Sequence, residues 1–274
     1  MDKKFKLFAK PYLVWLFVLA ILPIFVMLFL SVTFTEGLSL ENLEFSLYQF
    51  KVLMERAVLQ AFFNSFFYAF LTTVISLVFG YILAYEIHKS RFKNKFFILT
   101  ILILPMWTNL LLRTEALGNL MEKNNILTNL LNVSNSLELK GKMIGVIIGL
   151  VLTYMPFMIL SIYTALEKID ISLEEAALDL GLTPLQKFWK VIFPLSLKGV
   201  VTGSILVFLP SMSGFAISQV LGSGNIVLIG NIIEASFRTM DYNLGSLLSV
   251  IILVIILGAL YIVSKVDKEG ETLL

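Results

Sequence analysis

The sequence predicts an all-α polytopic membrane protein with six transmembrane helices, and three observations lead to this prediction. First, the 274 residues are 58% hydrophobic and 15% charged, with a mean hydropathy of +0.90. Soluble domains carry about 25% charged residues, so this chain lacks the polar surface that would cover a globule. Second, six stretches are long and apolar enough to cross a bilayer. Third, the polar segments between them alternate in their content of basic residues.

Each expected span contains about 20 mostly apolar residues, the length that crosses the hydrocarbon core. In chain order the spans are expected at about 12–34, 59–84, 96–112, 143–166, 200–221 and 244–263. The N-terminal stretch starts with basic residues, as a signal peptide does, but its apolar run is too long for one and it lacks a small-residue cleavage site. We therefore expect it to be kept as the first span. No internal repeat or soluble domain is visible, and residues 1–274 are expected to form a single transmembrane domain.

The distribution of Lys and Arg predicts the orientation of the spans. Of the 21 basic residues, 14 lie in four segments: the N-terminal segment, the link between the second and third spans, the segment at about 170–198, and the C-terminal segment. The other seven lie in the alternate loops. Basic residues are retained on the cytoplasmic side of a membrane, which is the positive-inside rule. This rule predicts an N-in/C-in topology with residues 170–198 in the cytoplasm.

The loops expected on the outer side show fewer recognisable sequence patterns than the segments expected in the cytoplasm. Residues 35–58 are mildly acidic and are expected to include a short surface helix, and residues 125–137 are expected to form a helix on the outer face. Residues 221–237 place three glycines around an apolar middle, which is typical of a re-entrant loop whose backbone is satisfied by protein or water. Asn64 and Ser65, near the outer start of the second span, are expected to bond to neighbouring helices.

The longest patterned polar segment runs from residue 172 to residue 194 and reads SLEEAALDLGLTPLQKFWKVIFP. Its pattern predicts two short amphipathic helices joined by a tight corner. Ser172 and Glu175 fit a capping box at the start of the first helix. Gly181 stands where a helix end favours a left-handed residue.

The second of these helices is expected to begin directly after the glycine corner. Thr183 and Gln186 fit a second capping box, and Pro184 occupies the first helical turn. Apolar residues recur at helical spacing in both halves: Leu173, Ala176, Ala177 and Leu180, then Leu185, Phe188, Trp189 and Ile192. Two capped amphipathic helices between membrane spans therefore predict a surface that binds a partner.

The composition excludes several classes of chemistry. Without cysteine, the chain has no disulfide, zinc thiolate or catalytic thiol. His88 is the single histidine, which does not support a histidine-based metal site or a Ser-His-Asp triad. No nucleotide-binding GxxxxGK[ST] loop is present. An intramembrane enzyme needs a nucleophile and a base, or metal ligands, facing one cavity, so we expect a protein that is not an enzyme.

Residues 175–181 and 191–194 resemble the EAA loop of bacterial ATP-binding-cassette (ABC) importer permeases. That pattern has Glu-Ala-Ala, a glycine four residues after the second alanine, a nine-residue spacer, and a hydrophobic-x-hydrophobic-Pro end, and this sequence meets every position. The resemblance extends to residues 102–113, 154–170 and 209–233. Together these stretches are similar to spermidine/putrescine permeases of the PotB type.

This resemblance implies a MetI-like type I importer fold and a non-catalytic permease subunit in the bacterial cell (inner) membrane. The implied partners are a second permease subunit of the C type in a heterodimer, two copies of a cytoplasmic ATPase, and an extracellular or periplasmic polyamine-binding protein. ATP and magnesium are expected on the ATPase, with no cofactor, metal or nucleic acid on this chain. The alternatives are an importer of another small solute and, less favoured, a secondary carrier, which would show repeats and interrupted helices around midplane ions.

The resemblance also implies which residues contact the ATPase. The expected coupling residues are Glu175, Ala176, Ala177, Asp179, Gly181 and Pro194. The alternative is a membrane-surface helix with ordinary capping, in which Glu175 only closes its capping box.

A polyamine pathway should offer carboxylates, carbonyl groups and aromatic faces, the last through cation–π attraction. The candidate residues are Trp107, Glu115, Tyr154, Ser211 and Gln219. Pro105 is expected to kink the third span just before Trp107. An interfacial ion pair with Arg113 is the alternative for Glu115, and membrane-interface or helix-packing roles are the alternatives for the others.

Overall fold

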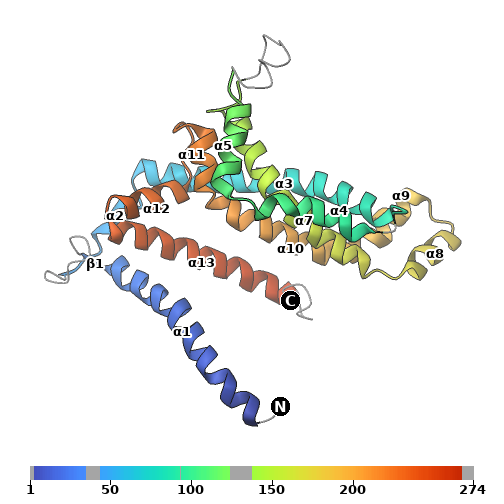
Figure 1. Ribbon diagram of the computed structural model, residues 1–274, viewed down its shortest axis with the longest axis horizontal. Helices are drawn as coiled ribbons and strands as arrows, with labels where there is room; N and C mark the ends of the chain where they lie inside the picture. Colours follow the sequence, from blue (N-terminus) through green and yellow to red (C-terminus); the bar gives the residue numbers. More distant parts are fainter. Residues whose placement is uncertain (1–2, 35–43, 93, 124–137, 267–274) are drawn as a thin grey trace. The chain divides into compact units, whose positions relative to one another are not determined.

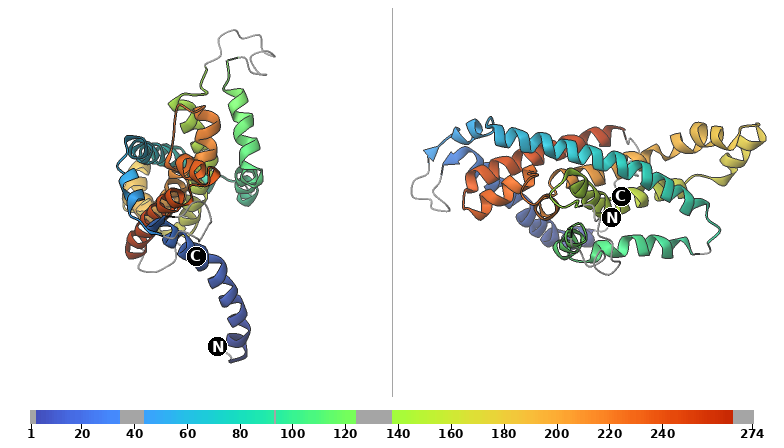
Figure 2. Two further views of the ribbon diagram at one scale, coloured as in Figure 1. Left: turned by 90° about the vertical axis from the view of Figure 1, so that its left-hand side faces the viewer. Right: turned by 90° about the horizontal axis from the view of Figure 1, so that it is seen from above.

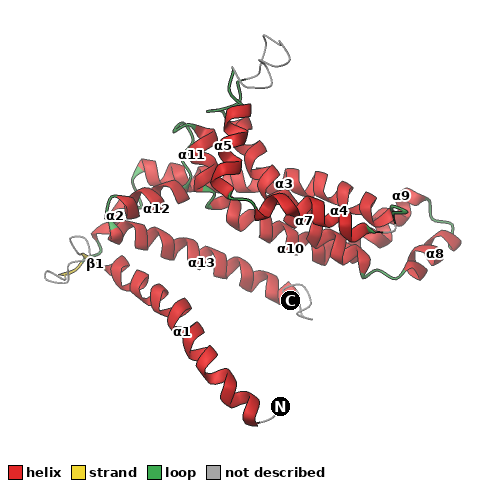
Figure 3. Ribbon diagram, in the orientation of Figure 1, coloured by secondary structure: helices red, strands yellow, loops and turns green. Residues whose placement is uncertain are grey.

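The computed structural model describes residues 3–34, 44–92, 94–123 and 138–266, and most of them are helical (Figures 1 and 3). The chain divides into two compact units. One comprises residues 1–60 and 232–257, and the other comprises residues 61–231 and 258–274. The expectation of a single transmembrane domain stays a prediction.

The first unit contains the N-terminal helix and most of the C-terminal helix. Its elements are α1 (Lys3–Val32), β1 (Thr33–Phe34), β2 (Glu44–Phe45), α2 (Tyr48–Val52), most of α12 (Ile229–Arg238) and much of α13 (Tyr242–Val266). The buried side chain of Asn243 donates hydrogen bonds to the carbonyl oxygens of Leu30 and Thr33, which ties the end of α1 to the start of α13. The short helix α2 confirms the helix expected within residues 35–58.

The second unit carries the remaining helices. They are α3 (Arg56–Lys89), α4 (Lys95–Ile103), η1 (Leu104–Trp107), α5 (Leu110–Leu120), α7 (Met143–Glu167), α8 (Ile171–Asp179), α9 (Pro184–Lys187), η2 (Phe188–Ile192), α10 (Phe193–Met212) and α11 (Phe215–Gly222). The helices α3, α7 and α10 run side by side, and α8 and α9 lie at one end of them (Figures 1 and 2). The helix expected at residues 125–137 lies outside the described residues.

Five described helices have the length and composition to cross a membrane, and the number rises to six if α4–η1 and α5 form one bent span. This confirms the predicted class of an all-α, multi-span membrane protein. The third span is broken by 92° between Trp107 and Leu110, as expected for a kink after Pro105. Asn109 begins the second half, because its side chain accepts hydrogen bonds from the backbone N–H groups of Leu111 and Leu112.

The fifth span differs from its expected bounds of 200–221. One helical path runs from Pro184 to Met212, through the π-helical turn η2, and α11 follows as a separate short helix. The path breaks at Ser213 and Gly214, where a Cβ on the glycine would lie 2.9 Å from Leu150. The start of this helix therefore belongs to the segment that the distribution of basic residues predicts to be cytoplasmic.

Close helix packing in the second unit depends on glycine. A Cβ at Gly199 on α10 would lie 2.5 Å from the Cβ of Ala165 and 2.6 Å from the carbonyl oxygen of Ser161, both on α7. A Cβ at Gly149 on α7 would lie 2.2 Å from Leu221 on α11. Half of the residues in the membrane-crossing apolar stretch of α7 are buried, so this helix forms the centre of the unit.

Candidate functional site

The helix α8 begins two residues earlier than the sequence pattern predicts. Asp170 is its N-cap, and the Asp170 side chain accepts a hydrogen bond from the backbone N–H of Ser172 at 2.9 Å. The hydrogen bonds from Ser172 hold the pKa of the exposed Asp170 carboxyl below its usual range. The predicted capping box of Ser172 and Glu175 is therefore wrong, because Ser172 lies inside the first turn and Glu175 one turn further along.

The end of α8 confirms the prediction for Gly181. Its φ is +80°, in the left-handed region, and its N–H donates to the carbonyl oxygen of Leu178 at 2.9 Å. The N–H of Leu182 donates to the carbonyl oxygen of Ala177 at 3.2 Å, which completes a Schellman motif. No atom lies within 4 Å of a Cβ built on Gly181, so the backbone conformation, and not a lack of space, favours glycine here.

The second predicted capping box is present. The Thr183 side chain accepts from the N–H of Gln186 at 3.3 Å, and the Gln186 side chain accepts from the N–H of Thr183 at 3.0 Å. The helix α9 lasts one turn and continues through η2 into α10. The second helix of the segment is thus the first part of a long helix that continues into α10.

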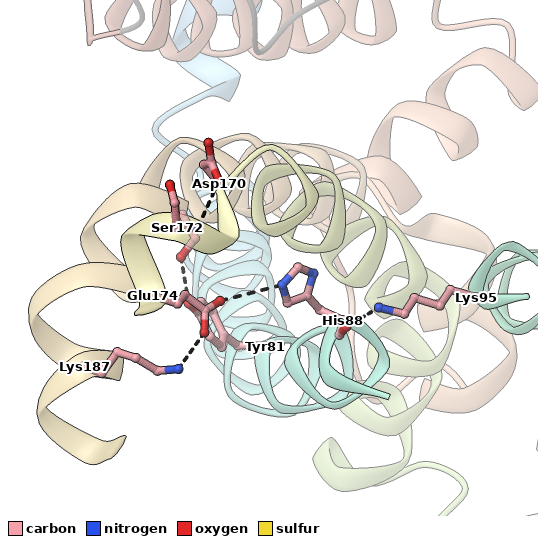
Figure 4. Close-up of polar contacts among 8 residues, drawn as sticks. Tyr81, His88, Lys95, Asp170, Ser172, Glu174 and Lys187 are labelled. Atoms are coloured by element: carbon pink, nitrogen blue, oxygen red, sulfur yellow. Dashed lines mark hydrogen bonds and ion pairs between the residues drawn. The ribbon is translucent and has the colours of Figure 1, made fainter. Parts of the chain in front are cut away.

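An ion cluster joins α8 to neighbouring helices (Figure 4). The Glu174 carboxylate pairs with the Lys187 ammonium at 2.6 Å and lies 3.9 Å from Nε2 of His88, at the end of α3. The Lys95 side chain donates a hydrogen bond to the backbone carbonyl oxygen of His88. Sequence reasoning missed this cluster, because its members come from separate helices and share no short motif.

Aromatic side chains join the start of this long helix to α3. The Phe188 ring packs edge-on against the rings of Tyr81 and Tyr85 on α3, at centroid distances of 5.5 and 5.3 Å. The Tyr81 hydroxyl lies 2.7 Å from the Ser196 hydroxyl on α10. These contacts, together with the ion cluster, hold the segment against the end of α3.

The structure divides the expected coupling residues into two groups. Five of them are exposed: Glu175, Ala176, Asp179, Gly181 and Pro194. Ala177 is 4% exposed and faces inward, away from any partner. Large apolar side chains of the same segment are also exposed, with exposed fractions from 47% to 83%: Ile171, Leu173, Leu180, Leu185 and Trp189. We call these ten exposed residues the coupling surface, after the role that the resemblance predicts for the first five.

The expected pathway residues do not line a common cavity among the described residues. Trp107 is 89% exposed and lines a groove between α4, η1 and α7, whereas Glu115 and Gln219 are exposed elsewhere on the unit. Tyr154 is half-buried between two apolar clusters. Ser211 is fully buried, and its hydroxyl has no hydrogen-bond partner in the described part of the chain.

The groove has a volume of about 780 Å³ and a mostly apolar lining. Its charged lining residues are Lys95 and Glu167, one of each sign. This balance does not favour a polycation within the groove. Across the described ranges, no group of three or more His, Asp or Glu side chains is placed to hold a metal ion.

Asn231 organises the loop between α11 and α12. Its side-chain oxygen accepts from the Ser218 hydroxyl at 2.6 Å and from the N–H of Leu228 at 2.9 Å, and its amide donates to the carbonyl oxygen of Phe215. This network was not foreseen from the sequence.

Two further hydrogen bonds attach the same loop to α3. The Ser65 hydroxyl accepts from the N–H of Ile229 at 2.8 Å, and the Asn64 side chain donates to the carbonyl oxygen of Val227 at 3.2 Å. Ser65 thus joins α3 to the first residue of α12, as expected of a bond between helices, whereas Asn64 bonds to the loop before α12. Side chains of the protein thus bond to the backbone groups of Val227, Leu228 and Ile229, as burial at membrane depth would require.

Comparisons with known proteins agree on the type of protein. Residues 76–266 match the family model described as "Binding-protein-dependent transport system inner membrane component". The chain is 31% identical over 259 residues to the spermidine/putrescine transport system permease protein PotB of Haemophilus influenzae, covering 93% of this chain and 91% of that protein. It is 32% identical over 254 residues to PotB of Escherichia coli, covering 91% and 92%.

Solved structures show the same fold. A bacterial ABC transporter involved in the import of the acidic polysaccharide alginate matches with a TM-score of 0.77 at 15% identity, over 96% of both chains. The alginate transporter in complex with its pentasaccharide-bound periplasmic protein matches with a TM-score of 0.77 at 16% identity, over 98% of this chain and 96% of that one.

Proposed function

Because the chain belongs to the family of binding-protein-dependent transport system inner membrane components, we propose that it forms half of the membrane pathway of a polyamine importer. As a member of this family, it is a non-catalytic, multi-pass permease subunit of the inner membrane. The observation that carries the choice of cargo is the identity to spermidine/putrescine permeases along nearly the whole chain. The alginate transporters share the fold alone and do not bear on the cargo.

In this proposal, the coupling surface docks on a cytoplasmic ATPase. Glu175 and Asp179 place two carboxylates beside the small side chain of Ala176, and exposed leucines surround them. Several large apolar side chains exposed along one short segment are typical of an interaction site. The partner that fits it has an apolar cleft with basic residues at its rim. Ala177 supports the surface from the inside.

The orientation belongs to the same proposal. The excess of Lys and Arg in the four segments that include residues 170–198 supports a cytoplasmic position for both termini and for the coupling surface. Closure of the ATPase would displace α8 and α9, and the continuous helix from Pro184 to Met212 would carry that displacement into the membrane.

The complete importer in this proposal has four kinds of subunit. A second permease forms the other half of the pathway, two copies of the ATPase bind ATP and magnesium, and a polyamine-binding protein delivers the cargo. The family description names a binding-protein-dependent system, and one structural relative was solved with a periplasmic protein, which supports this last partner. This chain is proposed to hold no cofactor.

Reconstitution in proteoliposomes with these partners tests the proposal. We expect ATP-dependent uptake of radiolabelled spermidine or putrescine that requires the binding protein. ATP-dependent uptake of sulfate without polyamine uptake would contradict the cargo. Polyamine uptake that persists without ATP would instead indicate a secondary carrier.

A charge reversal tests the docking surface separately. Glu175→Lys is expected to reduce the amount of ATPase that co-purifies with the permease, because the carboxylate lies exposed on α8. Glu44→Lys is the matched control, since it reverses an exposed carboxylate in the other unit. Equal co-purification of the ATPase with both variants would exclude Glu175 from the contact.

The cargo contacts can be tested in the same system. Trp107, Glu115, Tyr154, Ser211 and Gln219 remain the candidates. Glu115→Gln and Gln219→Ala are expected to lower polyamine uptake, because both side chains are exposed and offer oxygen acceptors to an ammonium group. Unchanged uptake in both variants would place the cargo contacts elsewhere.

A further inference from the structure

Two adjacent carboxylates on α8 lie in different environments. Glu175 belongs to the Glu-Ala-Ala sequence and is exposed, whereas the side chain of Glu174 is 17% exposed. Its partner Lys187 retains 10% of its side-chain exposure, and the His88 side chain retains 19%. A largely buried ammonium requires a partner of opposite charge, and Glu174 is that partner. Figure 4 shows Glu174 between Lys187 and His88.

The three residues come from three elements of the second unit. Glu174 lies on α8, and His88 lies at the end of α3. Lys187 is the last residue of α9, directly before the helix continues through η2 into α10. The His88 ring also packs edge-on against Tyr163 of α7, at a centroid distance of 6.5 Å. The Glu174 carboxylate is therefore the point where α8 meets two of the long helices.

Apolar packing alone would hold α8 weakly. Of the nine residues of α8, Ala177 is the one that is buried. The connection to α9 turns at Gly181, around which a Cβ would meet no atom within 4 Å. A helix with one small buried side chain and an open corner can turn about that corner unless another contact fixes it.

We propose that Glu174 is a positioning residue for the coupling step: it holds α8 to Lys187 and His88, so that displacement of the coupling surface moves α10 and α3. This inference rests on the proposed function, because it assigns a role within ATPase coupling. Glu174 contacts no cargo or nucleotide and acts through α8. Without the Glu174 carboxylate, closure of the ATPase moves α8 but not α10 and α3, so ATP is hydrolysed with little transport.

The test measures coupling and not only activity. In proteoliposomes with all partners, polyamine molecules transported are counted per ATP hydrolysed. Glu174→Gln removes the charge at nearly constant size, and we expect the transport ratio to fall at least ~5-fold, the lower end of typical coupling between sites. The amount of bound ATPase and its hydrolysis rate are expected to change much less. Glu86→Gln, an exposed carboxylate on α3, is the matched control and should keep the ratio.

Two further changes separate positioning from simple instability. Lys187→Met is expected to lower the ratio as Glu174→Gln does, because it removes the other member of the 2.6 Å ion pair. The reversed pair Glu174→Lys with Lys187→Glu is expected to recover a large part of the ratio. A spin label at the exposed Ser172 should be more mobile in both single variants and less mobile in the reversed pair.

The outcomes distinguish this inference from the proposed function. If the unmodified chain shows no ATP-driven uptake with its partners, the proposed function fails. If the unmodified chain transports and Glu174→Gln keeps the full ratio, this inference alone fails. A reversed pair that is no better than the single variants would also overturn it, because a loss that charge reversal cannot repair does not come from the ion pair.

Discussion

The Arg113 guanidinium donates a hydrogen bond of 2.7 Å to the carbonyl oxygen of Pro105, across the break between η1 and α5. The two halves of the third span meet there at 92°, and the side chain and N–H of Thr108 bond to the same oxygen. The sequence left Arg113 as an alternative ion-pair partner of Glu115. The structure gives it a different role, as a cation that bonds a carbonyl group at the helix break.

Arg113→Gln should therefore destabilise the bent junction between η1 and α5. We expect the free energy of unfolding to fall by about 1.5–3 kcal/mol, the range for a hydrogen bond to a charged group. In detergent, the apparent melting temperature should fall by a few degrees, about 2–4 °C per kcal/mol for a chain of this size. Glu115→Gln provides the comparison, and an equal loss in that variant would restore the ion-pair interpretation.

Gly181 is predicted to be required for its backbone conformation. Gly181→Val should abolish ATP-driven uptake while the protein remains in the membrane, because a left-handed conformation costs a non-glycine residue roughly 1–2 kcal/mol. Gly181→Asn should retain much of the uptake, since Asn adopts this conformation more readily. Uptake is measured at matched membrane levels of the two variants. Equal loss in both would mean that steric exclusion of the partner, and not the backbone, decides the effect.

The glycine at the contact of α7 and α10 gives a prediction about stability. Gly199→Ala should destabilise the fold by about 1–3 kcal/mol, the usual cost of overpacking, because its Cβ would lie 2.5 Å from that of Ala165. Gly258→Ala is the control, since no atom lies within 4 Å of its built Cβ. Size-exclusion chromatography of the solubilised variants reports the fraction of folded protein. A normal profile for Gly199→Ala would show that the two helices can separate without penalty.

Asn231 is expected to hold the loop between α11 and α12 in place. Asn231→Ala leaves the N–H of Leu228 without its acceptor, at a cost of about 1–3 kcal/mol for a buried donor. Hydrogen exchange should then accelerate in a peptide covering residues 222–231. Asn225→Ala, which removes an exposed hydrogen bond to Gly141, should change exchange much less. Similar exchange in both variants would assign the order of the loop to apolar packing.

Asp170 makes the order of α8 dependent on pH in the acid range. Its pKa is lowered in the folded protein, so its contribution as N-cap is present above its unfolded pKa of about 4, and is lost as the pH falls through the lower folded value. A spin label on α8 should keep the same mobility from pH 5 to pH 8. Asp170→Asn should behave like the unmodified chain at neutral pH, whereas Asp170→Ala should show higher mobility there. A transition near pH 6 would point to a different group.

Local patterns predicted the features that depend on neighbouring residues. The Thr183 and Gln186 capping box and the left-handed Gly181 involve groups within a few positions of each other, so the residue types are sufficient to specify them. Apolar stretches of about 20 residues predicted the spans for the same reason. The prediction of the first capping box failed because Asp170, two residues before Ser172, caps the helix and places Ser172 inside its first turn.

The sequence by itself determined that this is a multi-span membrane protein, and its EAA pattern indicated the importer permeases. Only the tertiary structure decided that Ala177 faces inward, that Glu174 joins Lys187 and His88, and that Arg113 bonds to Pro105. The physical reason is the range of the interactions involved. Hydropathy and capping act along one helix, whereas burial and ion pairing depend on which helices meet, and no short motif records that.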